Sequence, residues 1–529
     1  MPGFRADVAV VGGGVGGCAA ALAAADLGCT VVLSEETAWE GGQFTSQAVP
    51  PDEHPWIETT GCTARYRAFR EAVRARYRAR PDLRPEARAD LRLNPGNGSV
   101  SRLCHEPAVA LAVLRDLLGE HERAGRVRIL RRHRPVEALV QADRVRAVLL
   151  EALTGTAPGG AAATVEIEAP FFVDATELGD LLPLCGVEHV LGAEAAAETG
   201  EPHAAAAADP RDQQACTVCF AVEHRPGEDH TIARPETYAA WRDFRPPGWP
   251  GPLLGFSVPD PRTLEPVARP LFADVPAFSL WRYRRIVDAA LWDPASGVRD
   301  VTLVNWPQND YFAGPICGVP PDEAARNLAA ARALSLSLLH WLQTEAPRPD
   351  GGAGHPGLRL RPDVVGAGPD GLALAPYVRE SRRIRAVRTV VEQDVSSAAR
   401  PKGPERFADS VGVGAYRIDL HPSTAGRNYI DIGAWPFQIP LGALLPVRVT
   451  NLLPGCKNLG VTHITGGCYR LHPTEWNVGE SAGTLAAFCV RRRAAPHQVR
   501  ARAGLLDEFQ SVLVRSGVQL DWLGDIRPL

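Results

Sequence analysis

VAVVGGGVGG, residues 8–17, carries the strongest indication of the architecture of this chain. Its glycines follow the G-x-G-x-x-G pattern directly after four apolar residues, and an alanine-rich segment, 18–27, comes next. A second apolar strand, 30–33, completes the order strand, glycine turn, helix, strand. This order predicts a β-α-β unit that binds a dinucleotide.

The glycines and a following acid have distinct tasks in such a unit. Gly12 permits the tight turn, Gly14 lets the backbone approach a pyrophosphate, and Gly17 lets the helix pack closely on the strand. Glu35 lies just past the second strand, where its carboxylate can accept hydrogen bonds from a ribose hydroxyl, and Glu36 is the adjacent candidate. The alternative is a glycine turn in another kind of α/β protein, which the complete unit disfavours.

Four further blocks lack the regular period of a core helix or strand. They are WEGGQFTSQ (39–47), FVDATELGD (172–180), YVRESRR (377–383) and RLHPTEWNVGESAG (470–483). In this order along most of the chain, they resemble the FAD-dependent oxidoreductases with a glutathione-reductase-type FAD-binding fold. The resemblance implies FAD as the cofactor.

The resemblance also implies where the cofactor lies. The Gly-Gly segment, Gly41, Gly42 and Gln43, is expected to pass the pyrophosphate and the flavin, and backbone near Pro135 and Val136 to close the adenine pocket.

Two later blocks are also implied to lie at the cofactor. Asp174 is expected near FAD, but Glu177 and Leu178 replace the Gly-Asp pair of many relatives, which puts the roles of Glu177 and Asp180 in doubt. The final helix is expected to aim its N-terminus at the flavin, with close approach at Asn477, Gly479 and Gly483. The alternative for these glycines is steric packing alone.

Candidate catalytic residues follow from the chemistry that a flavin oxidation needs. The removal of a hydride leaves a proton, and His54, His463 and His472 are the candidates to accept it, against the alternative of structural histidines. Arg382 belongs to an arginine-rich block that either anchors an acidic substrate or forms internal salt bridges. Asp310 lies in NWPQNDY (305–311), which favours a substrate-lining loop or an ordinary loop.

Two other patterns are expected to carry no redox or nucleotide chemistry. Cys216 and Cys219 lie far from the position of redox cysteines in disulfide reductases and are predicted to face opposite sides of a strand. The segment 366–371 repeats G-x-G-x-x-G, but Pro362 and Pro376 flank it, so no second dinucleotide unit is expected. No metal site is expected either, because no further Cys or His pair has suitable spacing.

Composition bounds the class of protein. The chain has 529 residues, 45% of them hydrophobic, and a formal net charge of only −4 without long blocks of like charge. We therefore expect a small-molecule partner and neither a nucleic-acid nor a membrane partner, and a cytoplasmic location; the oligomeric state is open.

The predicted architecture is α/β. A Rossmann-like FAD-binding lobe, with a parallel sheet in three layers, takes residues 1–190 and is rejoined by 441–529, and a mixed α+β substrate lobe takes 191–440. Expected elements include helices at 108–124, 321–344 and 503–516, and one strand across 164–175.

The expected function is the oxidation of a small molecule by hydride transfer to flavin N5 from a C–H bond next to oxygen or nitrogen. A flavin monooxygenase that consumes NAD(P)H and a flavin electron-transfer subunit are the alternatives.

Overall fold

The centre of the protein is a five-stranded parallel sheet. The computed structural model describes residues 3–156, 162–368, 370–524 and 526–529. Within it the strand order is β23-β8-β2-β3-β4. The strands are β2 (Val8–Val11), β3 (Val31–Glu35), β4 (Val127–Arg131), β8 (Phe171–Asp174) and β23 (Leu452–Pro454). Because β23 pairs with β8, the C-terminal segment contributes a strand to the same sheet as the N-terminal one.

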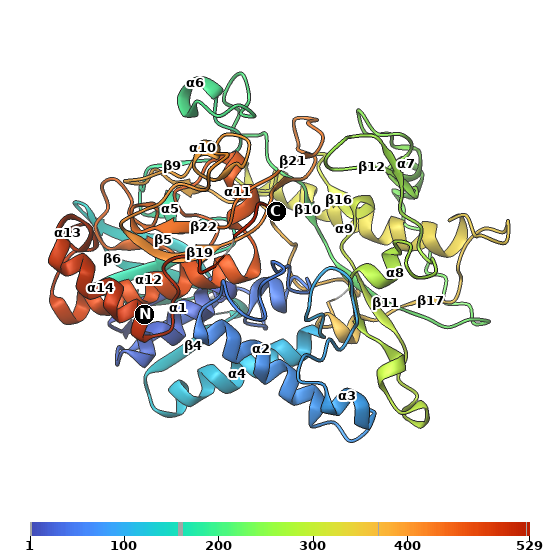
Figure 1. The fold of residues 1–529 in the computed structure, drawn as a ribbon, viewed down its shortest axis with the longest axis horizontal. Coiled ribbons are helices and arrows are strands. Elements are labelled where there is room, and N and C mark those ends of the chain that lie inside the picture. The colour runs from blue at the N-terminus through green and yellow to red at the C-terminus, as the bar shows by residue number, and fades with distance from the viewer. Residues whose placement is uncertain (1–2, 157–161, 369, 525) are drawn as a thin grey trace.

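Helices cover one face of this sheet, and β2 shows why. Val8 and Val10 point into the core beneath the helices, whereas Ala9 and Val11 point into a separate core on the opposite face. The helices of this lobe are α1 (Val15–Asp26), α2 (Ala64–Arg78), α3 (Pro85–Ala89), α4 (Pro107–Arg123), α12 (His472–Arg492), α13 (Pro496–Ala501) and α14 (Ala503–Arg515). In Figure 1 α12 and α14, in red, lie beside the blue α1 although almost the whole chain separates them.

A second, mainly antiparallel sheet covers the opposite face. Its order is β1-β7-β6-β5, formed by β1 (Gly3–Arg5), β5 (His133–Gln141), β6 (Arg144–Thr156) and β7 (Ala162–Glu168). The single strand expected across 164–175 is therefore wrong. It is two strands, β7 in this sheet and β8 in the parallel sheet, and Pro170 lies at the break because proline has no N–H to continue a ladder.

The middle of the chain forms a second lobe with its own core. Four antiparallel strands in the order β14-β15-β11-β17 pack with the long helix α9 (Pro321–Thr344), whose bounds match the prediction. The strands are β11 (Phe220–His224), β14 (Arg285–Val287), β15 (Val301–Val304) and β17 (Leu358–Leu360). This lobe lies to the right in Figure 1. The predicted α/β fold, with a Rossmann-like lobe and a mixed second lobe, is confirmed.

Short elements complete the two lobes and the region between them. The strand pairs are β9 (His189–Val190) with β18 (Arg383–Ile384), β10 (Cys216–Thr217) with β16 (Asp310–Tyr311), β12 (Ser257–Pro259) with β13 (Pro266–Ala268), β19 (Ser410–Gly414) with β22 (Phe437–Pro440), and β20 (Ile418–Leu420) with β21 (Ile430–Ile432). The short helices are α5 (Leu181–Leu184), α6 (Ala196–Thr199), α7 (Tyr238–Asp243), α8 (Leu280–Tyr283), α10 (Glu392–Val395) and α11 (His463–Tyr469).

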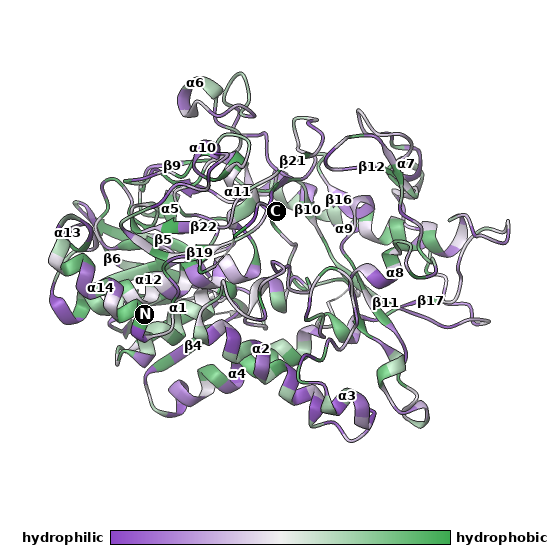
Figure 2. Ribbon diagram, viewed as in Figure 1, coloured by the Kyte–Doolittle hydropathy of each residue, from purple (hydrophilic) through white to green (hydrophobic). Residues whose placement is uncertain are grey.

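Helix α2 shows how a charged sequence still buries a face. Tyr66, Phe69, Val73 and Tyr77 recur at helical spacing and are buried, while arginines occupy much of the rest, so the helix is both purple and green in Figure 2. None of the helices among the described residues combines the length and the hydrophobicity that crossing a membrane requires.

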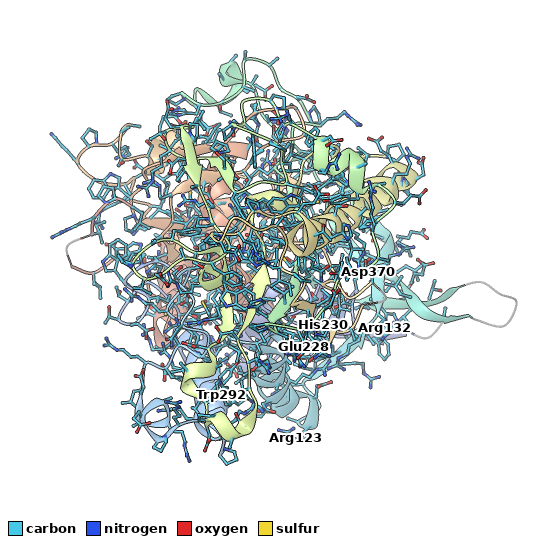
Figure 3. All side chains as sticks on the ribbon, turned by 90° about the vertical axis from the view of Figure 1, so that its right-hand side faces the viewer. Arg123, Arg132, Glu228, His230, Trp292 and Asp370 are labelled. Atoms are coloured by element: carbon cyan, nitrogen blue, oxygen red, sulfur yellow. The ribbon has the colours of Figure 1, made fainter. Side chains whose placement is uncertain are left out.

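The second G-x-G-x-x-G segment builds no nucleotide unit in the structure. Among the described residues after Gly371, no helix begins before α10. Asp370 of this segment, labelled in Figure 3, forms an ion pair with Arg332 of α9. Cys216 and Cys219 belong to different cores, and both thiols are free and buried.

Candidate functional site

A pocket lies where β2, β3 and β8 end, and we call it the glycine-turn pocket. It is lined by Gly12, Gly13, Gly14, Ser34, Glu35, Glu36, Thr37, Gly42, Ser46, Gln47, His133, Pro135, Ala175, Thr176, Glu177, Asp180 and Ala375. Parallel strands bring their carboxyl ends to one edge, which is where open α/β sheets bind ligands.

The glycine turn has the shape that the sequence predicted. Gly12 has a φ of +101°, and a Cβ there would stand 2.2 Å from the Ala175 carbonyl oxygen. A Cβ on Gly17 would stand 1.9 Å from the Gly12 carbonyl oxygen, so the helix packs directly on the turn. Helix α1 begins at Val15 with Gly14 as its N-cap, earlier than expected, which brings its free N–H groups into the pocket wall.

Glu35 ends β3 and faces the turn. Its Oε2 accepts a hydrogen bond from the Gly13 N–H at 3.1 Å, and its Oε1 accepts from the Thr37 N–H at 2.8 Å and the Thr37 hydroxyl at 2.6 Å. Burial raises the pKa of Glu35 to about 7, although the Thr37 hydrogen bonds oppose that rise. Glu36 also lines the pocket. Both acids thus lie at the pocket, and their contact with a ribose stays a prediction.

The Gly-Gly segment packs against the turn, and an acidic side chain lies between them. The Gly41 N–H donates to the Gly13 carbonyl oxygen at 2.7 Å. A Cβ on Gly14 and a Cβ on Gly42 would each lie 2.9 Å from Oε1 of Glu177. One carboxylate oxygen therefore occupies the space between the two backbones where the pyrophosphate is expected.

Lys457 holds that acidic side chain and was missed by sequence reasoning. Its buried ammonium pairs with Glu177 at 2.5 Å and with Glu475 at 3.3 Å. Burial opposes its charge, but the two carboxylates outweigh burial and raise the pKa of Lys457. Gln43 donates to Glu475 at 2.6 Å, so its side chain turns towards α12. Only the rarity of lysine in this sequence could have drawn attention to Lys457, because Glu177 is 280 residues away.

Two of the other cofactor predictions are refined. Asp174 ends β8, is fully buried and accepts hydrogen bonds from the N–H and hydroxyl of Thr176 at 3.1 and 2.7 Å. Burial raises its pKa to about 7. Pro135 and His133 line the pocket, whereas Val136 is 38% exposed on the alternate face of β5. The backbone near Pro135 therefore lies at the pocket, and a contact of Val136 with the adenine stays a prediction.

The block at 477–483 needs a correction. Helix α12 begins at His472, so Gly479 and Gly483 lie in its middle, where a Cβ would stand 2.0 Å from the Gly16 carbonyl oxygen and 2.2 Å from the Ala20 carbonyl oxygen. Asn477 donates to the Val413 carbonyl oxygen at 3.0 Å. These residues pack α12 on α1 and β19. Their positions agree with the alternative of steric packing and not with a close approach to the flavin.

A cavity of about 410 Å³ lies between the two lobes, and we call it the arginine cavity. It is lined by Asp52, Val258, Pro259, Pro261, Arg262, Arg269, Phe278, Leu280, Tyr283, Arg284, Asn305, Trp306, Pro307, Tyr377, Arg379, Tyr416, Arg417, Asp419, His421, Tyr429, Asp431 and Arg470. Its walls come from both lobes and combine aromatic rings with paired charges.

His421 is the histidine of this wall, oriented by a buried carboxylate. Its Nδ1 lies 2.6 Å from Oδ2 of Asp310. Oδ1 of Asp310 accepts from the Thr217 hydroxyl at 2.5 Å and forms an ion pair with Arg379 at 3.0 Å. Burial opposes the charge of Asp310, but Arg379 and His421 outweigh burial and lower its pKa. The other ring nitrogen of His421, Nε2, lies 3.7 Å from Oδ2 of Asp419 and is the atom left to exchange a proton.

Asp310 was predicted and His421 was not. Asp310 is fully buried behind the wall, and it acts on the cavity through Arg379 and His421. Arg379 and His421 lie 69 and 111 residues after Asp310 in the chain, so no local sequence pattern indicates that the three residues meet.

The predicted histidines, all among the described residues, lie elsewhere. His54 contacts the Gly61 carbonyl oxygen at 3.1 Å, and burial lowers its pKa to about 4. His463 lies between Glu380, at 2.9 Å, and Arg427, at 2.6 Å. None of the three lines the arginine cavity.

His472 and Arg382 are also held by structural contacts. The Asp52 N–H donates to Nδ1 of His472 at 3.1 Å, and burial lowers the pKa of His472 well below its ordinary value. Arg382 donates to the Leu178 carbonyl oxygen at 2.8 Å and pairs with Asp180 at 3.1 Å, beside the glycine-turn pocket. Their catalytic roles stay predictions to which this geometry lends no support.

Two chain segments connect the pocket with the cavity. Ser46 and Ala375 line the pocket and are joined by the hydrogen bond from the Ala375 N–H to the Ser46 carbonyl oxygen, at 3.0 Å. Further along the same segments, Asp52 and Tyr377 line the cavity. Since an extended chain rises about 3.3 Å per residue, the backbones of Ala375 and Tyr377 lie within roughly 7 Å of each other, so the linings of the two sites adjoin along this segment.

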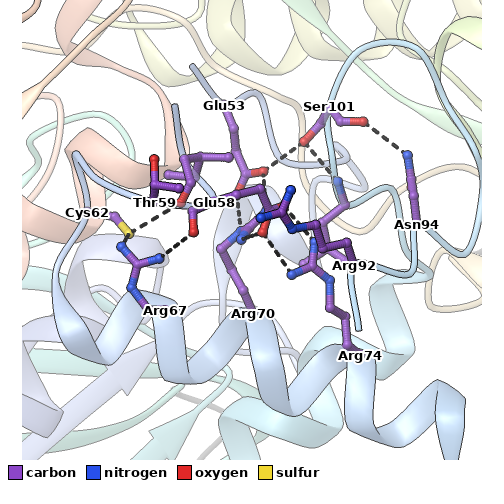
Figure 4. A network of polar contacts seen from close by, with 12 residues as sticks. Glu53, Glu58, Thr59, Cys62, Arg67, Arg70, Arg74, Arg92, Asn94 and Ser101 are labelled. Atoms are coloured by element: carbon purple, nitrogen blue, oxygen red, sulfur yellow. Dashed lines mark hydrogen bonds and ion pairs between the residues drawn. The ribbon is translucent and has the colours of Figure 1, made fainter. Parts of the chain in front are cut away.

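A buried ion network fixes the segment that carries Asp52. Glu53, next to it, accepts from Arg70 at 2.8 Å, and Glu58 pairs with Arg70 at 2.7 Å and with Arg74 at 2.6 Å (Figure 4). Burial would raise the pKa of Glu58, but the two arginines lower it to about 2. The network clamps this loop to α2 and so positions one wall of the cavity.

The residues of the glycine-turn pocket suit a dinucleotide once the Glu177 side chain moves out from between Gly14 and Gly42. Its backbone cradle is one that any side chain would fill, and Glu35 stands where a ribose needs an acceptor. Gln47 lines the pocket, and both atoms of its buried amide lack a hydrogen-bond partner among the described residues. The fold and this site define an α/β protein of the class that binds a dinucleotide cofactor at the carboxyl edge of its sheet.

The family is more specific. The family model described as FAD dependent oxidoreductase matches residues 7–513, and the chain belongs to this family. FAD is therefore its cofactor, and the resemblance noted in the sequence is confirmed.

Comparison with solved structures gives distant similarities. L-proline dehydrogenase from P. horikoshii is 16% identical over 36% of this chain and 24% of that chain, with a TM-score of 0.18. The 3-ketosteroid-delta4-(5alpha)-dehydrogenase of Rhodococcus jostii is 16% identical over 34% and 48%, with a TM-score of 0.21. The E. coli quinol fumarate reductase FrdA is 11% identical over 97% and 74%, with a TM-score of 0.33.

These similarities carry no argument about the substrate, and the chain spans less than half the length of the first two. No curated protein matches the chain.

Proposed function

We propose that this protein oxidises a small molecule in the arginine cavity, with FAD held in the glycine-turn pocket as the electron acceptor. The observation that carries the proposal is the place of the cavity. It adjoins the cofactor pocket through Ala375 and Tyr377, and its wall holds a histidine oriented by a buried carboxylate. When bound, FAD would accept a hydride at N5 from a C–H bond next to oxygen or nitrogen.

The residues of the chain have separate tasks in this proposal. The glycine turn, Glu35 and the Gly42 backbone hold the cofactor's phosphates and ribose. His421 takes up the substrate proton, and Asp310 orients its ring and stabilises the protonated form. The arginines and tyrosines of the wall orient the substrate and exclude water.

The experiment is anaerobic mixing of the FAD-loaded protein with candidate alcohols, amines and organic acids, and separately with NADPH. We expect the flavin absorption to bleach with a small-molecule donor and to recover in air or with a second acceptor, while NADPH leaves it oxidised. Bleaching by NADPH alone would favour the monooxygenase alternative instead. Electron exchange only with a protein partner would favour the relay.

The variant His421→Asn tests the proton-transfer role. We expect it to bind FAD as the native protein does and to slow bleaching about 100-fold or more, the lower range for the loss of a general base. Its matched control is His203→Asn, because His203 also pairs with a carboxylate, Glu392, but is half exposed and lies outside the cavity lining. Equal rates for the native protein and His421→Asn would refute the role.

A further inference from the structure

The arginine cavity carries more positive than negative charge. Six arginines line it, against three aspartates, and the two further carboxylates that pair with lining arginines, Asp310 with Arg379 and Asp260 with Arg269, still leave one more guanidinium group than carboxylates. Charges in a partly enclosed wall are screened less than charges at a surface, so the excess creates a positive potential inside. The cavity is therefore suited to an anion.

Arg284 is the least firmly paired of the three arginines that are buried in the wall. Arg379 approaches Asp310 at 3.0 Å and Arg470 approaches Asp419 at 3.1 Å. Both terminal nitrogens of Arg284, by contrast, lie 3.4 Å from the same oxygen of Asp52. A guanidinium hydrogen bond to a carboxylate is usually about 2.7–2.9 Å long, so this pair is loose.

The side chain of Arg284 is buried and is held through its Nε atom. Its side chain is only 9% exposed, and its Nε donates to the Asn305 carbonyl oxygen at 3.1 Å. That single bond fixes the direction of the side chain and leaves the planar end free of tight bonds. Such an end matches the two oxygens of a carboxylate.

The remaining wall is aromatic. Tyr283, Tyr377, Tyr416, Tyr429, Trp306 and Phe278 line the cavity. The Nδ2 atom of Asn305, Nε1 of Trp306 and the hydroxyl of Tyr429 are buried in this wall without a hydrogen-bond partner among the described residues. Rings of this kind pack against an apolar body, and small adjustments of these unpaired groups would let them bind its oxygen atoms.

We propose that the substrate of the arginine cavity is an organic carboxylate with an apolar or aromatic body, anchored by Arg284. This inference rests on the proposed function, because it names the class of molecule that the same cavity takes. The carboxylate oxygens bind the end of the Arg284 side chain in place of the loose contact with Asp52, and the body of the molecule lies along the tyrosines.

The test compares three probes that share one ring, namely phenylacetate, its neutral amide phenylacetamide and the cation 2-phenylethylamine. Each is titrated into the FAD-loaded protein by calorimetry, and the flavin spectrum reports whether it binds beside the cofactor. We expect phenylacetate to bind at least about tenfold more tightly than the amide and its binding to weaken with added salt. Equal or tighter binding of the amide or the amine overturns the inference.

Arg284→Gln removes the anchor, and Arg282→Gln is the matched control. Arg282 lies two residues earlier, donates to the Ala277 carbonyl oxygen and is outside the cavity lining. We expect the preference for phenylacetate to disappear in Arg284→Gln and to persist in Arg282→Gln. Equal loss in both variants contradicts the assignment.

Two further measurements keep the inference falsifiable. If Arg284→Gln does not fold, Arg284→Lys retains the charge without the planar fork, and we expect a reduced preference. A protein that oxidises a neutral alcohol or amine and shows no preference for carboxylates refutes this inference while the proposed function stands.

Discussion

The contact between α1 and α12 gives the sharpest prediction about the cofactor site. In Gly479→Ala the new Cβ would stand 2.0 Å from the Gly16 carbonyl oxygen, about 1 Å closer than the closest contacts that side chains make. The contact is between the backbone of α12 and the backbone of α1, so no flexible side chain can move aside. The two helices must separate, and the backbone of the glycine turn moves with α1.

The magnitude follows from two opposing effects. Alanine in place of glycine in a helix interior gains about 1 kcal/mol. Overpacking of a tight contact costs about 1–3 kcal/mol, and a contact between two backbones belongs at the upper end of that range. We therefore expect a net loss of about 1–2 kcal/mol of stability. We also expect FAD to bind about tenfold more weakly, because a shift of the turn misplaces its N–H groups.

The assay is thermal unfolding with and without FAD, together with fluorescence titration of the cofactor-free protein. Gly504→Ala is the matched control, because it makes the same substitution in α14, where a Cβ would meet no atom within 4 Å. We expect that variant to keep the native FAD affinity and to be as stable or more so. Gly479→Ala with native stability and native FAD affinity would refute the packing argument.

Three other perturbations have defined outcomes. Glu177→Gln removes a charge from the space expected for the pyrophosphate and frees Lys457, so a fluorescence titration should show FAD binding about tenfold more tightly. Lys457→Met should weaken the binding of FAD. Weaker binding of FAD by Glu177→Gln would show that this acid is a ligand instead. The folded-state pKa of Glu35, about 7, is higher than its ordinary value of 4.5, so its contribution to the stability of the cofactor-free protein is complete below pH 4.5 and is lost as the pH rises through 7. Glu35→Gln should flatten that part of the pH profile in urea unfolding, and an unchanged slope contradicts the assignment. Glu53→Ala breaks the buried network of Figure 4 and should lower the free energy of unfolding, measured in urea, by on the order of 3 kcal/mol. Glu71→Ala removes a half-exposed partner of the same network and should lower it by only about 0–1 kcal/mol. Equal losses of stability in the two variants would contradict the burial argument.

What the sequence predicts well here is local. The strand, turn, helix and acid of the first unit lie within 35 residues, and each follows from spacing that is visible in the chain. The bounds of α9 follow from its own period. Glu35 and Gly12 were found for this reason.

What the sequence does not show is convergence in space. The wall of the arginine cavity joins Asp52, Arg284, His421 and Arg470, which no local pattern connects. The glycines of α12 look alike whether they face a cofactor or another helix, and only the position of α1 distinguishes the two. A histidine likewise shows its role only through its partner, and the partner of His421 is 111 residues away.

The most direct test of the whole account is the absorption spectrum of the purified protein after saturation with FAD and gel filtration, set beside that of Gly12→Val. We predict one oxidised flavin per native chain, identified as FAD after release, and little or none in the variant, because a side chain at Gly12 would clash with Ala175 and strain a backbone with positive φ. A folded native protein that retains no FAD, or a variant that retains as much as the native protein, would contradict the account.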